Sequence, residues 1–410
     1  MKILCISQYF PPEMGALSAR ASELGKYWVE EGHQVTILTG FPNYPTGEIF
    51  PEYRDKIKKK VYVEELNGCR IVRTWLLTIP NGTPFQRILN YTSFFISAVI
   101  TGLRLNDFDI TIATSPQLLV GLAGYIISLV KRKPFVLEIR DLWPESLVGS
   151  GIGTDRSLFI RIIDRIARFL YTKSDHIIVL TRSFKDKLTC EREIDEYKIS
   201  LMENGIETDI FKPLKIEEKR KEELGLKDKF IISYIGTHGY AHGLETVLDA
   251  AEILKDDEDI IFLLIGEGAR KEYLINLTEE KELKNVKFMN FQPRKKIPMF
   301  INLSDVCMVL LKDSDIFKTV IPSKMLEFMA CGRPIILGVD GEAREIIQRA
   351  NAGIFIPPED SKKLVEAVIK LKKDASLREK MGRNGRKCVL SEFTRERKAK
   401  DYLKLLESLV

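Results

Sequence analysis

The sequence predicts an α/β protein made of two successive domains, each a doubly wound parallel sheet covered by helices. Short apolar runs alternate with amphipathic stretches along the whole chain, which is typical of parallel strands joined by crossover helices. The chain has 410 residues, more than a single domain of roughly 100–200 residues usually holds. Each half opens with a strand, a glycine-containing turn and a helix, at Gly15 and at Gly236. These observations favour two similar halves.

The composition is that of an ordinary globular protein. Apolar types make up 45% and charged types 30% of the residues, which excludes disordered and collagen-like chains. The net charge of +5, from 63 Lys and Arg against 58 Asp and Glu, is too dilute to indicate nucleic-acid binding. Six cysteines without a Cys-x-x-Cys pair argue against a disulfide framework or a zinc ribbon, so we expect a cytoplasmic protein.

Two uncharged segments raise the question of a membrane span. Ile88–Leu103 is too short and too polar, whereas Ile110–Val130, with 21 residues, is long enough. Residues 114–117 interrupt the second segment in the way that a strand end, a helix cap and a proline in the first helical turn would. We therefore expect a strand and a buried helix there, and no spanning helix. Met1 leads into a first strand rather than a signal peptide.

In the first half, apolar runs predict six strands, and the spacing of apolar residues predicts helices between them. The helix over 18–31 ends at Gly32, an expected C-cap. The helix over Leu158–Tyr171 carries arginines opposite its apolar side. Residues 40–55, rich in glycine, proline and aromatic types, are predicted to form a loop. The predicted strands are Ile3–Ser7, Gln34–Thr39, Arg70–Thr74, Ile110–Ala113, Phe135–Ile139 and His176–Leu180.

A turn near 202–206 and the charged stretch Lys215–Lys229 mark the domain boundary. We place the first domain at 1–207, the second at 208–390 and a last segment at 391–410. The end of the chain, Glu392–Leu409, reads as a charged helix with one apolar side. The strands predicted for the second half are Phe230–Ile235, Ile260–Ile265, Val286–Phe288, Val306–Leu310, Pro334–Leu337 and Gly353–Ile356.

The most informative candidate site lies between Pro322 and Pro334. Pro322 would start a helix whose first turn presents Ser323 and Lys324 to a phosphate. Glu327 lies one turn further and could accept hydrogen bonds from the vicinal hydroxyls of a ribose. The alternative is a short amphipathic helix whose glutamate is merely solvated.

The turn 236–243 follows the first strand of the second half and fits a phosphate cradle. His238 and His242 have the spacing of a zinc-binding pair, but Gly239 stands where a metalloprotease needs Glu. We therefore expect no metal there. The segment 266–268 is not a dinucleotide fingerprint, because Lys271 takes the place of the third glycine.

Polar and aromatic residues also follow a strand of the first half. Arg140, Asp141 and Trp143 come just after the strand over 135–139, and open α/β sheets bind ligands at the carboxyl ends of their strands. A helix N-cap at Asp141 with Trp143 packed locally is the alternative. Gly15 would let a ligand approach the first turn, unless that turn is an ordinary surface loop. A cleft between the two sheets would hold two substrates, one on each domain.

Taken together, these segments resemble the retaining glycosyltransferases of the GT4 family, over essentially the full chain. The resemblance implies the GT-B fold, two Rossmann-like domains facing a central cleft, with the last helix crossing back to the first domain. Residues 40–47, 140–146 and 317–324 resemble the WbuB-like subgroup, which acts in O-antigen, capsule and colanic-acid assembly. This implies transfer of a sugar, an N-acetylated amino sugar, from a UDP-sugar to a polyprenyl-diphosphate-linked saccharide, with retention of configuration.

The resemblance also implies roles for residues of the second domain. Glu327 matches the acid that holds the ribose, and Thr319 stands where the family has another acid. Thr237 and His242 replace the Arg and Lys with which many members grip the pyrophosphate, so that other cations and backbone amides would compensate. The implied donor-binding residues are Gly15, Gly236, His242, Gly243, Gln292, Arg294, Thr319, Ser323, Lys324 and Glu327.

In the first domain, Asp141 stands where many members have a histidine near the reacting sugar, which makes it the candidate catalytic residue. The implied acceptor-binding residues are Asn43, Tyr44, Arg140 and Trp143. No metal and no other cofactor is implied, because a helix N-terminus, amides and cations suit the departing nucleoside diphosphate.

The implied acceptor would sit at the inner face of the cytoplasmic membrane. A basic cluster at Lys56 and 58–60, together with the apolar segment Phe85–Leu105, fits peripheral membrane contact. A solvated charge run and a core helix are the alternatives. Two other functions remain open. A non-hydrolysing UDP-sugar 2-epimerase would need acid/base groups for which four histidines give little support, and a non-catalytic sugar-nucleotide-binding subunit would explain the departures at 237, 242 and 319.

Overall fold

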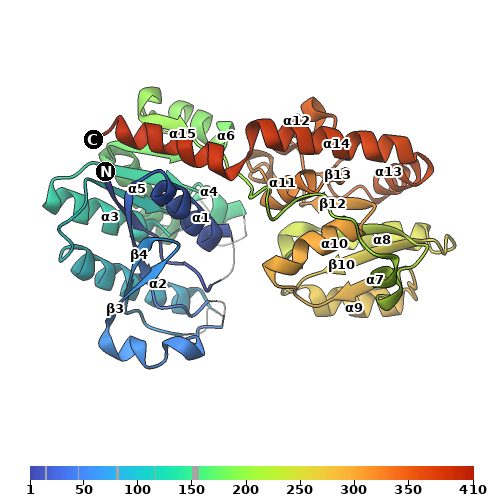
Figure 1. Cartoon of the computed structure of the whole chain (residues 1–410), viewed down its shortest axis with the longest axis horizontal. Helices are drawn as coiled ribbons and strands as arrows, with labels where there is room; N and C mark the ends of the chain where they lie inside the picture. The colour runs from blue at the N-terminus through green and yellow to red at the C-terminus, as the bar shows by residue number, and fades with distance from the viewer. Residues whose placement is uncertain (14–15, 45, 80–82, 116, 150–156) are drawn as a thin grey trace. The chain divides into compact units, whose positions relative to one another are not determined.

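The computed structural model describes residues 1–13, 16–44, 46–79, 83–115, 117–149 and 157–410. The chain forms two compact units (Figure 1). Unit 1 comprises Met1–Asn204 and Arg395–Val410, and unit 2 comprises Gly205–Thr394. These limits lie a few residues from the expected ones at 207 and 390.

Unit 1 is built on an eight-stranded sheet of order β3-β4-β2-β1-β5-β6-β7-β8. All neighbouring strands pair in parallel except the edge pair β3 and β4, which is antiparallel. The strands are β1 Lys2–Ile6, β2 Gln34–Gly40, β3 Val61–Leu66, β4 Cys69–Thr74, β5 Ile110–Thr114, β6 Phe135–Ile139, β7 His176–Val179 and β8 Ile199–Leu201. Six of these strands were expected from the sequence, whereas β3 and β8 were not.

The helices of unit 1 lie on both faces of this sheet. α2, α3 and α5 form a continuous layer, since α3 packs against both of the others. α1 packs against α15, where the Trp28 indole donates to the Ala399 carbonyl at 3.2 Å and stands edge-on to the Tyr402 ring. The helices are α1 Ala16–Glu30, α2 Pro84–Gly102, α3 Leu118–Lys131, α4 Glu145–Gly149, α5 Leu158–Lys173, α6 Arg182–Cys190 and α15 Arg395–Glu407.

The segment that was long enough for a membrane span is divided between β5 and α3. The strand is fully buried and packs against α3, whose buried residues include Val120, Ala123 and Ile127. None of the helices in the described part of the chain combines the length and the hydropathy that a membrane span needs.

Unit 2 is built on a six-stranded parallel sheet of order β11-β10-β9-β12-β13-β14. The strands are β9 Phe230–Ile235, β10 Ile260–Ile265, β11 Val286–Met289, β12 Val306–Leu310, β13 Ile335–Gly338 and β14 Gly353–Phe355. The helices are α7 Glu218–Glu223, α8 Glu245–Ile253, α9 Lys271–Glu280, α10 Ile297–Leu303, α11 Ser323–Ala330, α12 Glu342–Ala350, α13 Ser361–Lys373 and α14 Ala375–Glu392.

Two predictions about the ends of unit 2 were wrong in detail. The charged stretch Lys215–Lys229 is not a plain linker, because it contains the short helix α7. The last helix does not start at Glu392, because α14 ends there and α15 starts only at Arg395. Between them, the Phe393 carbonyl accepts a hydrogen bond from the Ile206 amide at 2.8 Å. In an unbroken helix this carbonyl would instead accept a hydrogen bond from an amide of the next turn.

The strand order of each sheet has one point at which the winding reverses. In unit 2 the chain runs outward from β9 to β10 and β11, and then returns to place β12 on the other side of β9. In unit 1 the reversal lies between β1 and β5. Ligands of open α/β sheets bind at the carboxyl ends of the strands beside such a point. The topology thus directs attention to the residues that follow β9 and β12, and those that follow β1 and β5.

Candidate functional site

In unit 2, the loop that follows β9 is locked against the loop that follows β10. The His238 amide donates to the Glu267 carbonyl, and the Arg270 amide donates to the His238 carbonyl, both at 2.9 Å. A Cβ atom on Gly268, whose φ is +156°, would lie 2.4 Å from the His238 carbonyl oxygen. The segment 266–268 therefore has a packing role, since its missing side chains let the two loops touch.

Lys324, in the first turn of α11, reaches the loop after β9. Its ammonium donates to the Tyr234 hydroxyl at 2.8 Å and lies 4.1 Å from the centre of that ring. The Tyr234 hydroxyl in turn donates to the Thr237 carbonyl at 2.8 Å. Burial lowers the pKa of Lys324 to about 7, and Glu327 opposes that shift. A Cβ atom on Gly236 would come within 2.8 Å of the ammonium nitrogen, so the glycine keeps this space open.

The two histidines of the same loop carry no charge at neutral pH. Burial, aided by nearby lysines, lowers the pKa of both His238 and His242 to about 4. His242 Nδ1 lies 3.5 Å from the Leu310 carbonyl at the end of β12, and Gly243 follows in the left-handed conformation with φ +54°. Within the described ranges, no group of three or more His, Cys, Asp or Glu could hold a metal ion.

Glu327 lies three residues after Lys324 on α11 and contacts Arg294. An Arg294 nitrogen lies 3.3 Å from a Glu327 carboxylate oxygen, and a second one lies 3.7 Å from Glu207. The Arg294 guanidinium also lies over the Phe211 ring. Gln292 is half-buried, and its side-chain amide donates to the Asn290 carbonyl at 3.1 Å. The structure thus brings Arg294 to the predicted ribose-binding acid.

Thr319 and Ser323 lie close in sequence but differ in environment. The Thr319 side chain is buried, and its hydroxyl donates to the Ile316 carbonyl at 2.7 Å within a 3-10 turn. Its hydroxyl proton is therefore used inside the turn. Ser323 is exposed as the first residue of α11, where the amides of the first helical turn have no partner within the helix.

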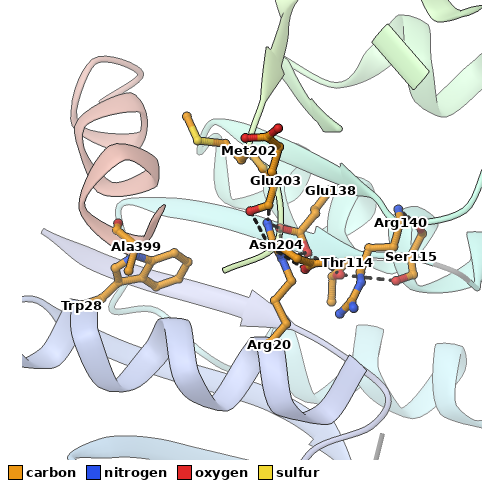
Figure 2. A network of polar contacts seen from close by, with 10 residues as sticks. All are labelled: Arg20, Trp28, Thr114, Ser115, Glu138, Arg140, Met202, Glu203, Asn204 and Ala399. Carbon is orange, nitrogen blue, oxygen red and sulfur yellow. Dashed lines mark hydrogen bonds and ion pairs between the residues drawn. The ribbon is translucent and has the colours of Figure 1, made fainter. Parts of the chain in front are cut away.

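In unit 1, a buried ion pair lies at the carboxyl ends of β5 and β6 (Figure 2). Arg20 of α1 binds the Glu138 carboxylate with its nearest contact at 2.9 Å, and the Thr114 hydroxyl donates to the same carboxylate at 2.9 Å. Arg20 also donates to the Met202 carbonyl and to the Asn204 side chain, both at 3.0 Å. Burial raises the pKa of Glu138, but Arg20 and Arg140 outweigh it and hold the pKa below its usual value.

The predicted catalytic residue Asp141 lies two residues beyond β6. It lines a small cavity together with Ser115, Gln117 and Tyr171. Burial raises the pKa of Asp141, and Arg140 opposes that shift. The Arg140 amide donates to the Ser115 hydroxyl at 2.8 Å (Figure 2). This bond fixes the start of the segment against the end of β5.

Arg140 and Trp143 follow β6, and both are half-buried. The Trp143 carbonyl accepts a hydrogen bond from the Tyr171 hydroxyl at 3.4 Å. Burial lowers the pKa of Arg140 to about 10, so its guanidinium stays charged at neutral pH. Asp141 therefore has a permanent cation as its neighbour in sequence.

The predicted acceptor residues Asn43 and Tyr44 are held by Glu13, which the sequence analysis did not select. The Glu13 carboxylate accepts hydrogen bonds from the amides of Phe10, Asn43 and Tyr44 at 3.2, 2.9 and 2.9 Å. Burial raises the pKa of Glu13 to about 7 although these amides lower it. Asn43 is buried, whereas the Tyr44 side chain remains 40% exposed. Gly15 lies outside the described residues.

The described site residues fall into two groups. Unit 2 holds Gly236, His242, Gly243, Gln292, Arg294, Thr319, Ser323, Lys324 and Glu327, and unit 1 holds Asn43, Tyr44, Arg140, Asp141 and Trp143. The missed acids are Glu138, within β6, and Glu13, in the segment after β1, and both are buried. However, the sequence does not indicate which acids are buried.

Each unit matches a family profile of known proteins. Residues 15–205 match the family profile described as "Glycosyl transferase 4-like domain", and residues 215–388 match "Glycosyl transferases group 1". The chain is 24% identical over 342 residues to the putative colanic acid biosynthesis glycosyl transferase WcaI of Escherichia coli K12, covering 81% of this chain and 82% of that one.

Two solved structures resemble the whole chain. Sucrose-phosphate synthase from Thermosynechococcus elongatus is 20% identical with a TM-score of 0.76, covering 100% of this chain and 98% of that one. HepE of Anabaena, in complex with UDP-glucose, is 16% identical with a TM-score of 0.73, covering 100% of both chains. These likenesses show the GT-B fold of two Rossmann-like units. With both halves matched by family profiles, the chain belongs to the GT4 family of glycosyltransferases.

Proposed function

We propose that this glycosyltransferase moves an N-acetylated amino sugar from a UDP-sugar to a lipid-diphosphate-linked saccharide, with retention of configuration, in surface polysaccharide biosynthesis. The observation that carries the proposal is the placement of Lys324 and Glu327 on α11, beside the point where the unit 2 sheet reverses its winding. Colanic acid synthesis is the process named for the relative WcaI, and UDP-glucose is the ligand named for HepE. The WbuB-like segments support the amino sugar and the lipid acceptor.

Glu327 is the proposed ribose-binding group. A carboxylate offers about four acceptor positions on its two oxygens, so it can bind Arg294 and the ribose hydroxyls together. Charged groups form stronger hydrogen bonds than neutral ones, which suits a carboxylate to this role. Gln292, next to this pair, is the proposed contact for the base.

The diphosphate would lie against the first turn of α11 and the loop after β9. As the bond to the sugar breaks, negative charge develops on the leaving diphosphate, and Lys324 with the amides at Ser323 would stabilise it. Gly236, His242 and Gly243 would contribute backbone at close approach. We propose that transfer needs no metal ion, which a reaction that proceeds fully in EDTA would support.

Unit 1 is the proposed acceptor side. Asp141, whose burial raises its pKa, is proposed to orient the reacting sugar or the acceptor hydroxyl. Asn43, Tyr44, Arg140 and Trp143 are proposed to bind the acceptor saccharide. A lipid-linked acceptor requires the enzyme to work at the inner face of the cytoplasmic membrane, as a peripheral protein.

The surface of unit 1 supports membrane contact, although not mainly through the predicted lysines. Lys58 pairs with Asp55, and Lys56 lies over the Tyr53 and Tyr62 rings. In contrast, the layer of α2, α3 and α5 exposes large apolar side chains and has Asp164 as its one acid. We call these residues the apolar helix face: Phe85, Ile88, Leu89, Ile96, Ile100, Leu129, Val130, Leu158, Phe159, Ile162 and Phe169. Exposed arginines at 161, 165 and 168 adjoin it.

The decisive experiment measures release of UDP from a panel of UDP-sugars, with and without a lipid-diphosphate-linked saccharide. Release that requires both substrates, with the saccharide extended, supports the proposal. Conversion of the donor into its epimer without acceptor supports a 2-epimerase. Binding of the donor without turnover under any acceptor supports a non-catalytic binding subunit. The anomeric configuration of the product, read by NMR, tests retention.

A further inference from the structure

The Lys324 amino group lies in a largely buried environment and is not in salt-bridge contact with any carboxylate of the described residues. Among the described residues, no carboxylate oxygen lies within 4.0 Å of its ammonium nitrogen, and the Tyr234 hydroxyl is its one hydrogen-bond partner. An ammonium group has three N–H donors, so two of them remain for another acceptor. The nearest acid along the helix, Glu327, instead contacts Arg294. Because burying an ammonium without a counter-ion is costly, this arrangement favours an anionic ligand.

The rest of the turn supplies no cation. Thr237 is uncharged, and His238 and His242 are neutral at pH 7 because burial and nearby lysines lower their pKa values to about 4. His242 further directs Nδ1 toward the Leu310 carbonyl. The loop after β9 can therefore offer a diphosphate its backbone amides but no positive charge.

Tyr234 places the lysine at this loop. Its side chain is fully buried on β9, and its hydroxyl bridges the Lys324 ammonium and the Thr237 carbonyl with two contacts of 2.8 Å. The centre of the same ring lies 4.1 Å from the ammonium nitrogen, which adds a cation–π attraction. Gly236 leaves the ammonium room, since a Cβ atom there would lie 2.8 Å from it. Lys324 itself stays partly exposed, so a ligand can reach it.

We propose that Lys324, positioned by Tyr234, is the cation that binds the donor diphosphate, and that donor binding takes up a proton at this lysine. The inference rests on the proposed function, because it assumes a nucleoside diphosphate in unit 2. The charged form of the lysine is disfavoured by burial and by the absence of a carboxylate, and a diphosphate supplies the missing negative charge. The titratable groups that face Lys324 are Tyr234, His238, His242 and Glu327.

The sign of the pH dependence follows from this arrangement. In the free protein the pKa of Lys324 is lowered to about 7, so above that pH the lysine is mostly neutral and binding must add a proton. The dissociation constant for UDP should then rise by up to about tenfold per pH unit above neutrality. The two neutral histidines do not titrate in that range. The terminal phosphate of UDP, with a second pKa of about 6, also stays ionised there.

The test is calorimetry of UDP binding to the full chain between about pH 7 and 8.5, in buffers of different ionisation enthalpy. Wild type should take up protons and bind UDP progressively more weakly as the pH rises. Lys324→Met should bind UDP about ten- to a hundredfold more weakly, without proton uptake, yet bind uridine like wild type. Lys318→Met is the matched control, since Lys318 is an exposed lysine in the same segment that pairs with Asp315.

Tyr234→Phe separates positioning from mere packing. The ring and its burial remain, but the ammonium loses its hydrogen-bond acceptor, so the fall in UDP affinity should begin at a lower pH than in wild type. A purely structural role would weaken binding equally at every pH. If Lys324→Met does not fold, Lys324→Arg serves instead, because its guanidinium stays charged and should remove the pH dependence.

The outcomes distinguish the inference from the proposed function. If wild type binds UDP and Lys324→Met binds it within about twofold of wild type, the lysine is not the diphosphate cation and the inference is wrong, while the proposed function stands. A pH profile of Lys324→Arg as steep as that of wild type would also overturn it. If wild type binds none of UDP, GDP and ADP, the donor site in unit 2 is refuted and the inference falls with it.

Discussion

At the scale of single residues, Glu327 is expected to dominate recognition of the nucleoside. Its carboxylate lies 3.3 Å from Arg294 and is proposed to accept hydrogen bonds from the ribose. Glu327→Ala should weaken UDP binding by about 1–3 kcal/mol, because charged hydrogen bonds are lost and Arg294 loses an acceptor. Calorimetric titration checks the value, and Glu366→Ala, which removes an exposed acid of α13, is the control. Unchanged UDP affinity would refute the ribose role.

The raised pKa of Glu13 leads to a prediction about how the free energy of unfolding depends on pH. Its folded-state pKa is raised from 4.5 to about 7 by burial, so over that interval the folded protein binds more protons than the unfolded chain. The contribution of this residue to the free energy of unfolding is therefore present at low pH and falls as the pH rises, by about 1.4 kcal/mol per unit at most. In Glu13→Gln this fall should be absent. Urea denaturation of both proteins between pH 5 and 8 measures it, and parallel profiles would contradict the buried carboxylate.

Single residues of the site were predictable where their chemistry is local. Ser323, Lys324 and Glu327 follow a proline at a helix start, so their neighbours in sequence fix their positions. Arg20 and Glu138 are different, because a buried ion pair depends on two residues 118 positions apart. Nothing near Glu138 distinguishes it from a surface acid at the end of a strand.

At the scale of elements, burial on both faces made strands predictable. β6, β9, β10 and β12 have the predicted bounds and consist of buried residues throughout. The missed strand β3 is half exposed, with Glu64 and Glu65 within it, because it pairs with the sheet on one edge only. Such an edge strand lacks the continuous apolar run that identifies a central parallel strand. β8, with three residues, is too short to show a pattern.

The contact between the loops after β9 and β10 leads to a prediction with a matched control. Gly268→Ala should destabilise unit 2 by about 1–3 kcal/mol, because φ is +156° and the new Cβ would meet the His238 carbonyl at 2.4 Å. It should also weaken UDP binding by displacing the loop after β9. Gly239→Ala, in that same loop, meets side-chain atoms only at 3.5 and 3.6 Å and should be tolerated. Chemical denaturation compares the two, and equal stability would contradict the packing role of 266–268.

At the scale of the whole molecule, the division into two units was predictable from the sequence. That the last helix returns to unit 1 was harder to predict. Alternation of strands and helices indicates two sheets without knowledge of any contact. The last helix belongs to unit 1, where Lys398 pairs with Glu203 at 2.6 Å and Trp28 donates to the Ala399 carbonyl. Its apolar side was visible in the sequence, but the surface that covers that side lies more than three hundred residues earlier, so only the resemblance could assign it.

The apolar helix face of unit 1 provides the last prediction, which concerns the molecule at a membrane. If the acceptor is lipid-linked, the protein should co-sediment with vesicles of anionic lipid, because exposed apolar side chains and adjacent arginines together favour such a surface. Higher salt should weaken binding, since it screens the arginines. The triple change Phe85→Ser, Ile96→Ser and Ile162→Ser should abolish it, whereas Tyr197→Ser, Ile253→Ser and Tyr273→Ser, which change exposed apolar residues elsewhere, should not. Replacing Lys56 and 58–60 by serine tests the basic cluster separately, and failure to bind vesicles at any salt concentration would refute membrane contact.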